Sequence, residues 1–158
     1  MLTESHIEKF RRLDAMRQRL DPDADHELWI WTAMNAATHL LNAALHHAGM
    51  TEETDSFHSQ VEGLYSVPDR STGSLSDAIH APGDLMHFGE PPLDQPVSPT
   101  LARAGAALKI IEDLREPYVW GDDPVPPGAT KEWERAYREC IAELTAVLRA
   151  RLKTAKGI

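Results

Sequence analysis

Apolar residues recur at every third or fourth position along four stretches of the chain, which is the spacing of one face of an α-helix. These stretches cover about residues 3–20, 25–48, 98–114 and 130–153. They are separated by residues that start or stop helices: Asp21-Pro22, Gly49, Ser98-Pro99 and Pro117. The pattern predicts an all-α protein built as an up-and-down four-helix bundle. With 158 residues the chain has room for one hydrophobic core, so we expect residues 1–158 to form a single helical domain.

The connection between the second and third predicted helices is the longest in the chain. Thr51 can cap a short accessory helix, in which Phe57, Val61, Leu64 and Tyr65 lie on one side. Proline and glycine then recur throughout residues 67–98, which predicts a long irregular crossover loop. Loops of this length inside a compact domain are usually either functional or disordered. Part of this loop, residues 77–92, contains both titratable and large apolar residues. We interpret it either as a loop pinned onto the bundle or as a lid over a pocket between helices.

The second predicted helix carries no charged side chain from Leu28 to Ala48. This stretch is long enough to cross a membrane. However, it contains asparagine and histidine residues and has acidic segments on both sides, so we expect no membrane association. The helix is then buried either at the centre of a bundle or in a dimer interface. The first functional hypothesis is a cytoplasmic binding or regulatory module that self-associates through residues 28–48, with a small molecule or a protein as a further partner.

Polar residues form a stripe along this uncharged helix at spacings of three and four: Thr32, Asn35, His39, Asn42 and His46. At 100° per residue all five lie on one narrow face. The stripe is either the solvent-facing edge of the helix, a dimer interface in which asparagine fixes the register, or the wall of a pocket. In the third case Asn35, His39, Asn42 and His46 are the candidate pocket residues, with the two histidines as ligands or acid–base groups.

The spacing Asp-x-x-His occurs four times, at Asp23/His26, Asp55/His58, Asp77/His80 and Asp84/His87. Residues three apart share a helix face, so each pair can offer a carboxylate and an imidazole to one metal ion. The alternative is that each Asp is a helix cap or turn residue. The second functional hypothesis is a divalent-metal binder or metal-dependent hydrolase. Its candidate ligands and acid–base groups are His39, His46, Asp55, His58, Glu62, Asp77, His80, Asp84 and His87.

Charge and cysteine content narrow the functional classes. The formal net charge is −9, from 16 Lys and Arg against 25 Asp and Glu, and such a chain is repelled by phosphate backbones. We therefore expect no general nucleic-acid binding. The single cysteine, Cys140, excludes an internal disulfide framework and is typical of a reducing cytoplasm. The first residues lack the apolar core of a signal peptide.

Arg19 and His26 satisfy the Arg-x4-6-His spacing of HEPN-type ribonuclease domains, to which the chain is also similar in its long paired helices. Asp21-Pro22 lies between the two residues, and Leu20 stands where that family usually has a polar group. The resemblance implies RNA cleavage by Arg19 and His26, which is the third functional hypothesis. DinB-like metal-binding bundles use a His-x-x-x-His pair late in the chain, and residues 130–153 contain no histidine. Whether the chain is an enzyme stays open among the three hypotheses.

Overall fold

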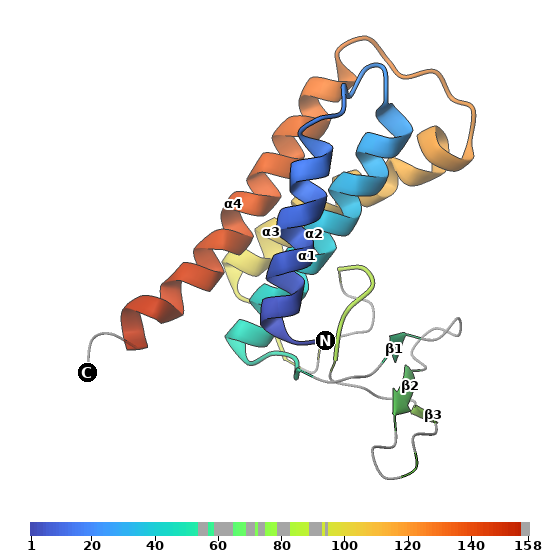
Figure 1. Ribbon diagram of the computed structural model, residues 1–158. Helices are drawn as coiled ribbons and strands as arrows, with labels where there is room; N and C mark the ends of the chain where they lie inside the picture. The colour runs from blue at the N-terminus through green and yellow to red at the C-terminus, as the bar shows by residue number, and fades with distance from the viewer. Residues whose placement is uncertain are drawn as a thin grey trace.

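Four α-helices pack against one another in the computed structural model, which describes residues 1–53, 57–58, 65–68, 72, 75–78, 83–88, 93 and 95–155 (Figure 1). They are α1 (Thr3–Arg17), α2 (His26–Ala48), α3 (Pro99–Asp113) and α4 (Ala129–Ala155). A short π-helix, η1 (Glu116–Trp120), follows α3. The predicted helical character is therefore confirmed. None of the helices among the described residues has the length and apolar content needed to span a bilayer.

Local signals in the sequence account for the ends of these helices. Gly49 adopts the left-handed conformation (φ 72°) and ends α2, and the Met50 N–H donates to the Leu45 carbonyl across this turn. Ser98 caps α3, where its hydroxyl accepts from the Leu101 N–H at 3.3 Å. These two ends match the predicted boundaries, because each depends only on residues that are adjacent in the chain.

A small antiparallel sheet lies between α2 and α3 in the chain. Its strands are β1 (Phe57–His58), β2 (Tyr65–Pro68) and β3 (Leu75–Ala78), in the order β1-β2-β3. The predicted accessory helix is therefore wrong at residues 57–58 and at Tyr65. The end of β2 and the whole of β3 lie in the predicted irregular loop. Tyr65–Pro68 alternates apolar and polar residues over only four positions, too few to outweigh the helical spacing of the surrounding apolar residues. Pairing with β3, from Tyr65↔Ala78 to Pro68↔Leu75, provides the stabilising partner.

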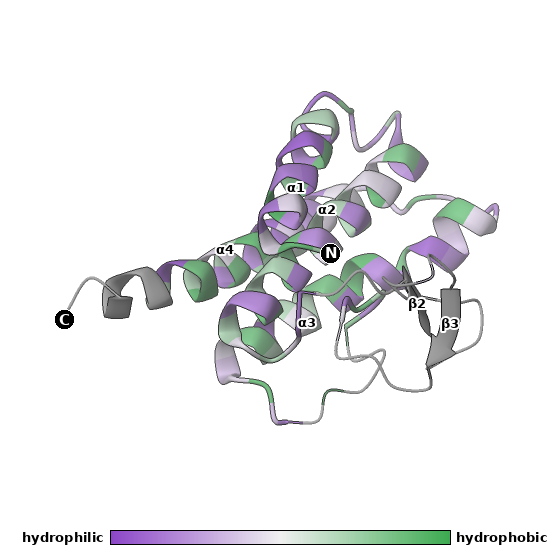
Figure 2. Ribbon diagram, turned by 60° about the horizontal axis from the view of Figure 1, so that its bottom comes forward, coloured by the Kyte–Doolittle hydropathy of each residue, from purple (hydrophilic) through white to green (hydrophobic). Residues whose placement is uncertain are grey.

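Helix α2 lies at the centre of the fold and packs against α1, α3, α4 and η1. Trp29, Ile30, Leu41 and Leu45 are fully buried on it. Several of its alanines are also fully buried and let the neighbouring helices approach closely: Ala33, Ala36, Ala37, Ala43 and Ala44. Burial within one chain is thus sufficient to explain why α2 carries no charged side chain from Leu28 to Ala48. In contrast, α1 is largely hydrophilic, and of its 15 residues only His6 is buried (Figure 2).

Candidate functional site

Three titratable side chains from distant segments meet beside the first turn of α1. His6 lies on α1, His46 in the last turn of α2, and Asp84 in the segment 83–88 that precedes α3. The Nε2 atoms of His6 and His46 each lie 3.0 Å from the same carboxylate oxygen, Oδ1 of Asp84. One ligand atom from each residue lies within 4.8 Å of the other two. Two imidazole nitrogens and a carboxylate oxygen form a donor set that divalent transition metals prefer.

Each of the two imidazoles is also held through its second nitrogen. His6 Nδ1 lies 2.9 Å from Nδ1 of His39, and His46 Nδ1 lies 2.7 Å from the hydroxyl of Thr51. The left-handed turn at Gly49 returns the chain so that Thr51 reaches His46. Metal-binding histidines are commonly oriented by such a partner on the ring nitrogen that does not bind the metal. Both Nε2 atoms are thereby directed at Asp84.

The protonation states at this cluster follow from its surroundings. Burial, followed by the positive charge of His6, lowers the pKa of His39 to about 4, so His39 is neutral at pH 7. Burial alone would raise the pKa of Asp84. Hydrogen bonds from His46 and His6, together with the Met1 amino group at 3.1 Å, instead hold it well below its usual range. Asp84 is therefore an ionised acceptor. A neutral His39 can accept a hydrogen bond from the Nδ1–H of His6. The Nε2–H groups of His6 and His46 donate to the Asp84 carboxylate, and a bound cation would take the place of these two protons.

Asn42 fixes the segment that carries Asp84. Its side-chain amide donates to the Leu85 carbonyl at 2.8 Å, and the Leu85 N–H donates to the Asn42 carbonyl oxygen at 2.6 Å. Both residues are buried. Farther along the segment, the ring of Phe88 lies over Gly105 of α3 so closely that an added Cβ would come within 2.3 Å of it. The segment is thus attached to α2 and α3 at positions on either side of Met86 and His87.

We expect Asn42→Ala to lower the free energy of unfolding by about 1–3 kcal/mol, because the buried Leu85 N–H and carbonyl would lose their partners. Exchange of the Leu85 amide hydrogen should accelerate in parallel. Urea denaturation and hydrogen exchange measure the two effects. Asn35→Ala is the matched control: Asn35 is exposed and, among the residues that the structure describes, bonds to the Trp31 carbonyl of its own helix, so we expect a change within about 0.5 kcal/mol. Equal losses in the two variants would contradict the proposed role of Asn42.

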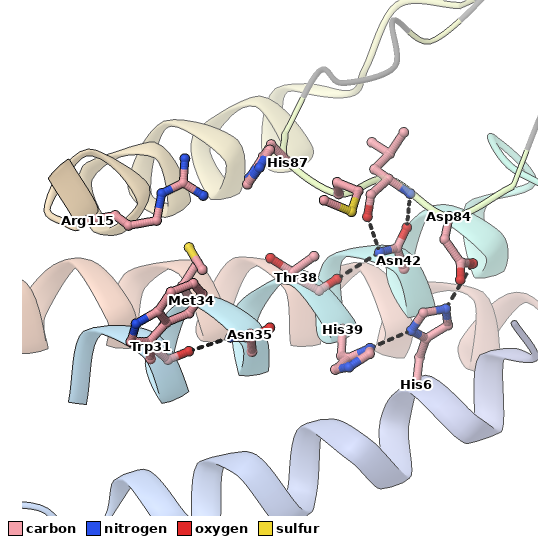
Figure 3. A pocket seen from close by; sticks show the side chains of 12 residues that line it. His6, Trp31, Met34, Asn35, Thr38, His39, Asn42, Asp84, His87 and Arg115 are labelled. Atoms are coloured by element: carbon pink, nitrogen blue, oxygen red, sulfur yellow. Dashed lines mark hydrogen bonds and ion pairs between the residues drawn. The ribbon is translucent and has the colours of Figure 1, made fainter. Parts of the chain in front are cut away.

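A pocket of about 360 Å³ opens beside the cluster, between α2, the segment 83–88 and the end of α3 (Figure 3). It is lined by His6, Trp31, Met34, Asn35, Thr38, His39, Asn42, Asp84, Leu85, Met86, His87 and Arg115. Three of the four candidate pocket residues predicted from the stripe on α2 lie in this wall: Asn35, His39 and Asn42. The fourth, His46, contacts Asp84 but does not line the pocket.

The structure gives Asp84 and His87, one of the predicted Asp-x-x-His pairs, different partners. Asp84 lies with His46, but its partner in the sequence, His87, places Nδ1 3.2 Å from Oε1 of Glu112. The pair separates because residues 83–88 are not helical, and a spacing of three shares a face only in a helix. His58 lies in β1 and Asp77 in β3, and the side chains of both lie outside the described part of the chain, as do the whole residues Asp55, Glu62 and His80.

Two residues of the cluster, His6 and Thr51, were not among the sequence candidates. His6 precedes Phe10 by four positions and Leu13 by seven, so it lies on the predicted apolar face of the first helix. A histidine on an otherwise apolar face is a signal that could have identified it. Thr51 was predicted to cap an accessory helix, and it instead contacts the histidine five residues before it. That contact depends on the turn at Gly49, and the sequence predicted only that α2 ends there.

Arg19 and His26 lie on either side of the turn between α1 and α2. Arg19 is exposed just after α1, and His26 is the first residue of α2. This turn is at the opposite end of α1 from His6 (Figure 1). The two residues are therefore separate from the cluster around Asp84.

The chain matches no protein-family model, no curated protein and no solved structure.

Proposed function

We propose that the protein binds a divalent transition metal through Nε2 of His6, Nε2 of His46 and the carboxylate of Asp84. The proposal rests on one observation: two buried imidazoles approach the same carboxylate oxygen at 3.0 Å, and each is oriented by a different partner on its other nitrogen. In metal centres a histidine commonly binds the metal through one ring nitrogen and is oriented by a hydrogen-bond partner on the other.

The class of chemistry follows from the number of ligands. Structural zinc sites are closed by four protein ligands, whereas catalytic sites have three and leave a position open. Among the described residues, three protein ligands converge here, and two of them, His6 and Asp84, also line the pocket. A metal held there supplies Lewis acidity, and the pocket provides space for a small substrate beside it. We therefore propose a metal-dependent hydrolase that acts on a small molecule.

Metal analysis tests the binding site directly. Protein purified without a polyhistidine tag should bind about one zinc ion per chain in calorimetric titration, and His46→Ala should abolish this binding. His26→Ala is the matched control, since His26 is also on α2 but lies far from Asp84. The proposal fails if Zn, Fe, Mn and Ni all stay at background, or if both variants bind zinc like the unmodified protein. In either case Asp84 is only a structural bridge between two histidines.

The finer architecture is part of the same proposal. We infer an up-and-down four-helix bundle in a single domain, supported by the alternating directions of successive helices and by the packing of α2 against the other three (Figure 1).

Self-association through residues 28–48 stays a prediction that sedimentation tests, with a monomer at high micromolar concentration as the contrary result. RNA cleavage by Arg19 and His26 stays a prediction too, and requires that His26→Ala abolish a nuclease activity. A cytoplasmic location stays a prediction.

A further inference from the structure

The end of the pocket farthest from the His6–Asp84 contact is formed by Arg115, which lies between α3 and η1 and directly precedes η1 (Figure 3). Its Nε atom is buried and has no hydrogen-bond partner among the described residues. The guanidinium carbon lies 4.5 Å from the ring centroid of Trp120 in η1. Leaving a buried charged donor unpaired costs free energy, and such groups are rare in folded proteins without a reason. A bound anion would satisfy this donor.

The walls between Arg115 and the metal-ligand cluster are largely apolar. Trp31, Met34 and Met86 line them, and methionine adapts its shape to different ligands. The Trp31 ring meets the Trp120 ring edge-on, with centroids 6.5 Å apart, and Trp120 in turn stacks on the Arg115 guanidinium. The two rings therefore form an aromatic surface that reaches Arg115. A planar apolar body would fit between these side chains. Asn35 and Thr38 add amide and hydroxyl groups along the same wall.

The charge around Arg115 favours a single negative charge on the ligand. Glu112, one turn earlier, is already paired with His87, and Glu116 follows Arg115 directly. One guanidinium faces the pocket in a chain whose net charge is −9, which disfavours a dianion. A planar guanidinium matches a carboxylate by two parallel hydrogen bonds.

We propose that this pocket binds a small monocarboxylate with a planar apolar body, held by its carboxylate at Arg115 and by its body between Trp31, Met34 and Met86. The opposite end of the ligand then lies toward His6 and Asp84. That this ligand is a substrate rests on the proposed function, because only a bound metal would make the pocket catalytic. Binding itself requires no metal, because Arg115 lies at the other end of the pocket from the metal-ligand cluster.

Benzoate and its neutral isostere benzamide are the probes, and metal-free protein is the starting material. Nuclear magnetic resonance would follow the indole N–H signals of Trp31 and Trp120 during titration. We expect benzoate to bind with a dissociation constant of about 1 mM or lower, and at least about tenfold more tightly than benzamide. The proposal is overturned if benzoate gives no shift at about 10 mM, or if the two probes bind equally. Tighter binding of phenyl phosphate than of benzoate would also overturn it, in favour of a phosphoryl ligand.

Two arginine variants locate the anion site. Arg115→Gln should weaken benzoate binding at least about tenfold and leave benzamide binding unchanged. Arg103→Gln is the matched control, because Arg103 is an exposed arginine that forms two hydrogen bonds with Glu143 far from the pocket. Unchanged benzoate binding in Arg115→Gln contradicts the proposal. The comparison of benzoate with benzamide on the unmodified protein decides the question even if Arg115→Gln fails to fold.

Titrations of the same protein with benzoate and with zinc distinguish this inference from the proposed function. Benzoate binding to Arg115 without any zinc binding would support the carboxylate site and refute the metal centre. Zinc binding without a preference for benzoate would support the metal centre and refute the carboxylate site. If both bind, we expect benzoate to be accommodated equally well with and without zinc.

Discussion

Asp84→Asn should weaken zinc binding at least about 100-fold, the upper end of what loss of an outer-shell partner alone costs. The carboxylate oxygen is the one atom that both His6 and His46 approach, and the amide that replaces it carries no charge and is a poor ligand for zinc. Substitution by asparagine keeps the size of the side chain and allows the two imidazoles to retain a hydrogen-bonding partner. Isothermal titration calorimetry with zinc measures the loss.

Asp113→Asn is the matched control for Asp84→Asn. Asp113 ends α3 as an exposed carboxylate paired with Lys109 at 2.6 Å, and it lies outside the cluster. Zinc binding to this variant should be unchanged. If Asp84→Asn binds zinc as tightly as Asp113→Asn does, Asp84 is not a ligand and the proposed centre is wrong.

Trp29→Ala should lower the free energy of unfolding by about 3–5 kcal/mol, the range for truncating a buried aromatic side chain to alanine. Trp29 is fully buried on α2, with ring centroids 6.5 Å from Trp133 and 6.1 Å from Tyr137 of α4. The substitution leaves a cavity where α2 and α4 meet and removes both aromatic contacts. Since small domains are stable by only about 5–15 kcal/mol, this loss is a large part of the total. Urea denaturation measures it.

Trp120→Ala is the control, because the Trp120 side chain is 64% exposed. Its loss should cost less than about 1 kcal/mol. A similar loss in both variants would show that burial on α2 is not what stabilises the fold.

The sequence predicted the elements whose causes are local. The end of α2 and the start of α3 could be found because Gly49 and Ser98 act through their own turns. The central position of α2 followed from its lack of charge between Leu28 and Ala48, although the sequence could not distinguish a bundle core from a dimer interface. The strands were missed because each is only two to four residues long and depends on pairing with another segment.

The candidate site was predicted in part, for a comparable physical reason. The stripe on α2 pointed to Asn35, His39, Asn42 and His46 because helical spacing is regular. The partners of that stripe come from elsewhere: His6 from α1, Asp84 and Leu85 from an irregular segment. Asp84 and His87 appeared as a pair only under the assumption of a helix. Which residues an irregular segment brings to a helix depends on its path, and local spacing does not encode that path.

His46 has a consequence for how the chain can vary. Its Nδ1 contacts Thr51 and its Nε2 contacts Asp84, so a single imidazole holds together the two ends of the excursion that contains β1, β2 and β3. The entropy of closing such an excursion grows only slowly with its length. Insertions or deletions between Thr51 and Asp84 can therefore accumulate during evolution without moving the residues around His46. The excursion is a position at which this architecture can gain or lose an accessory module.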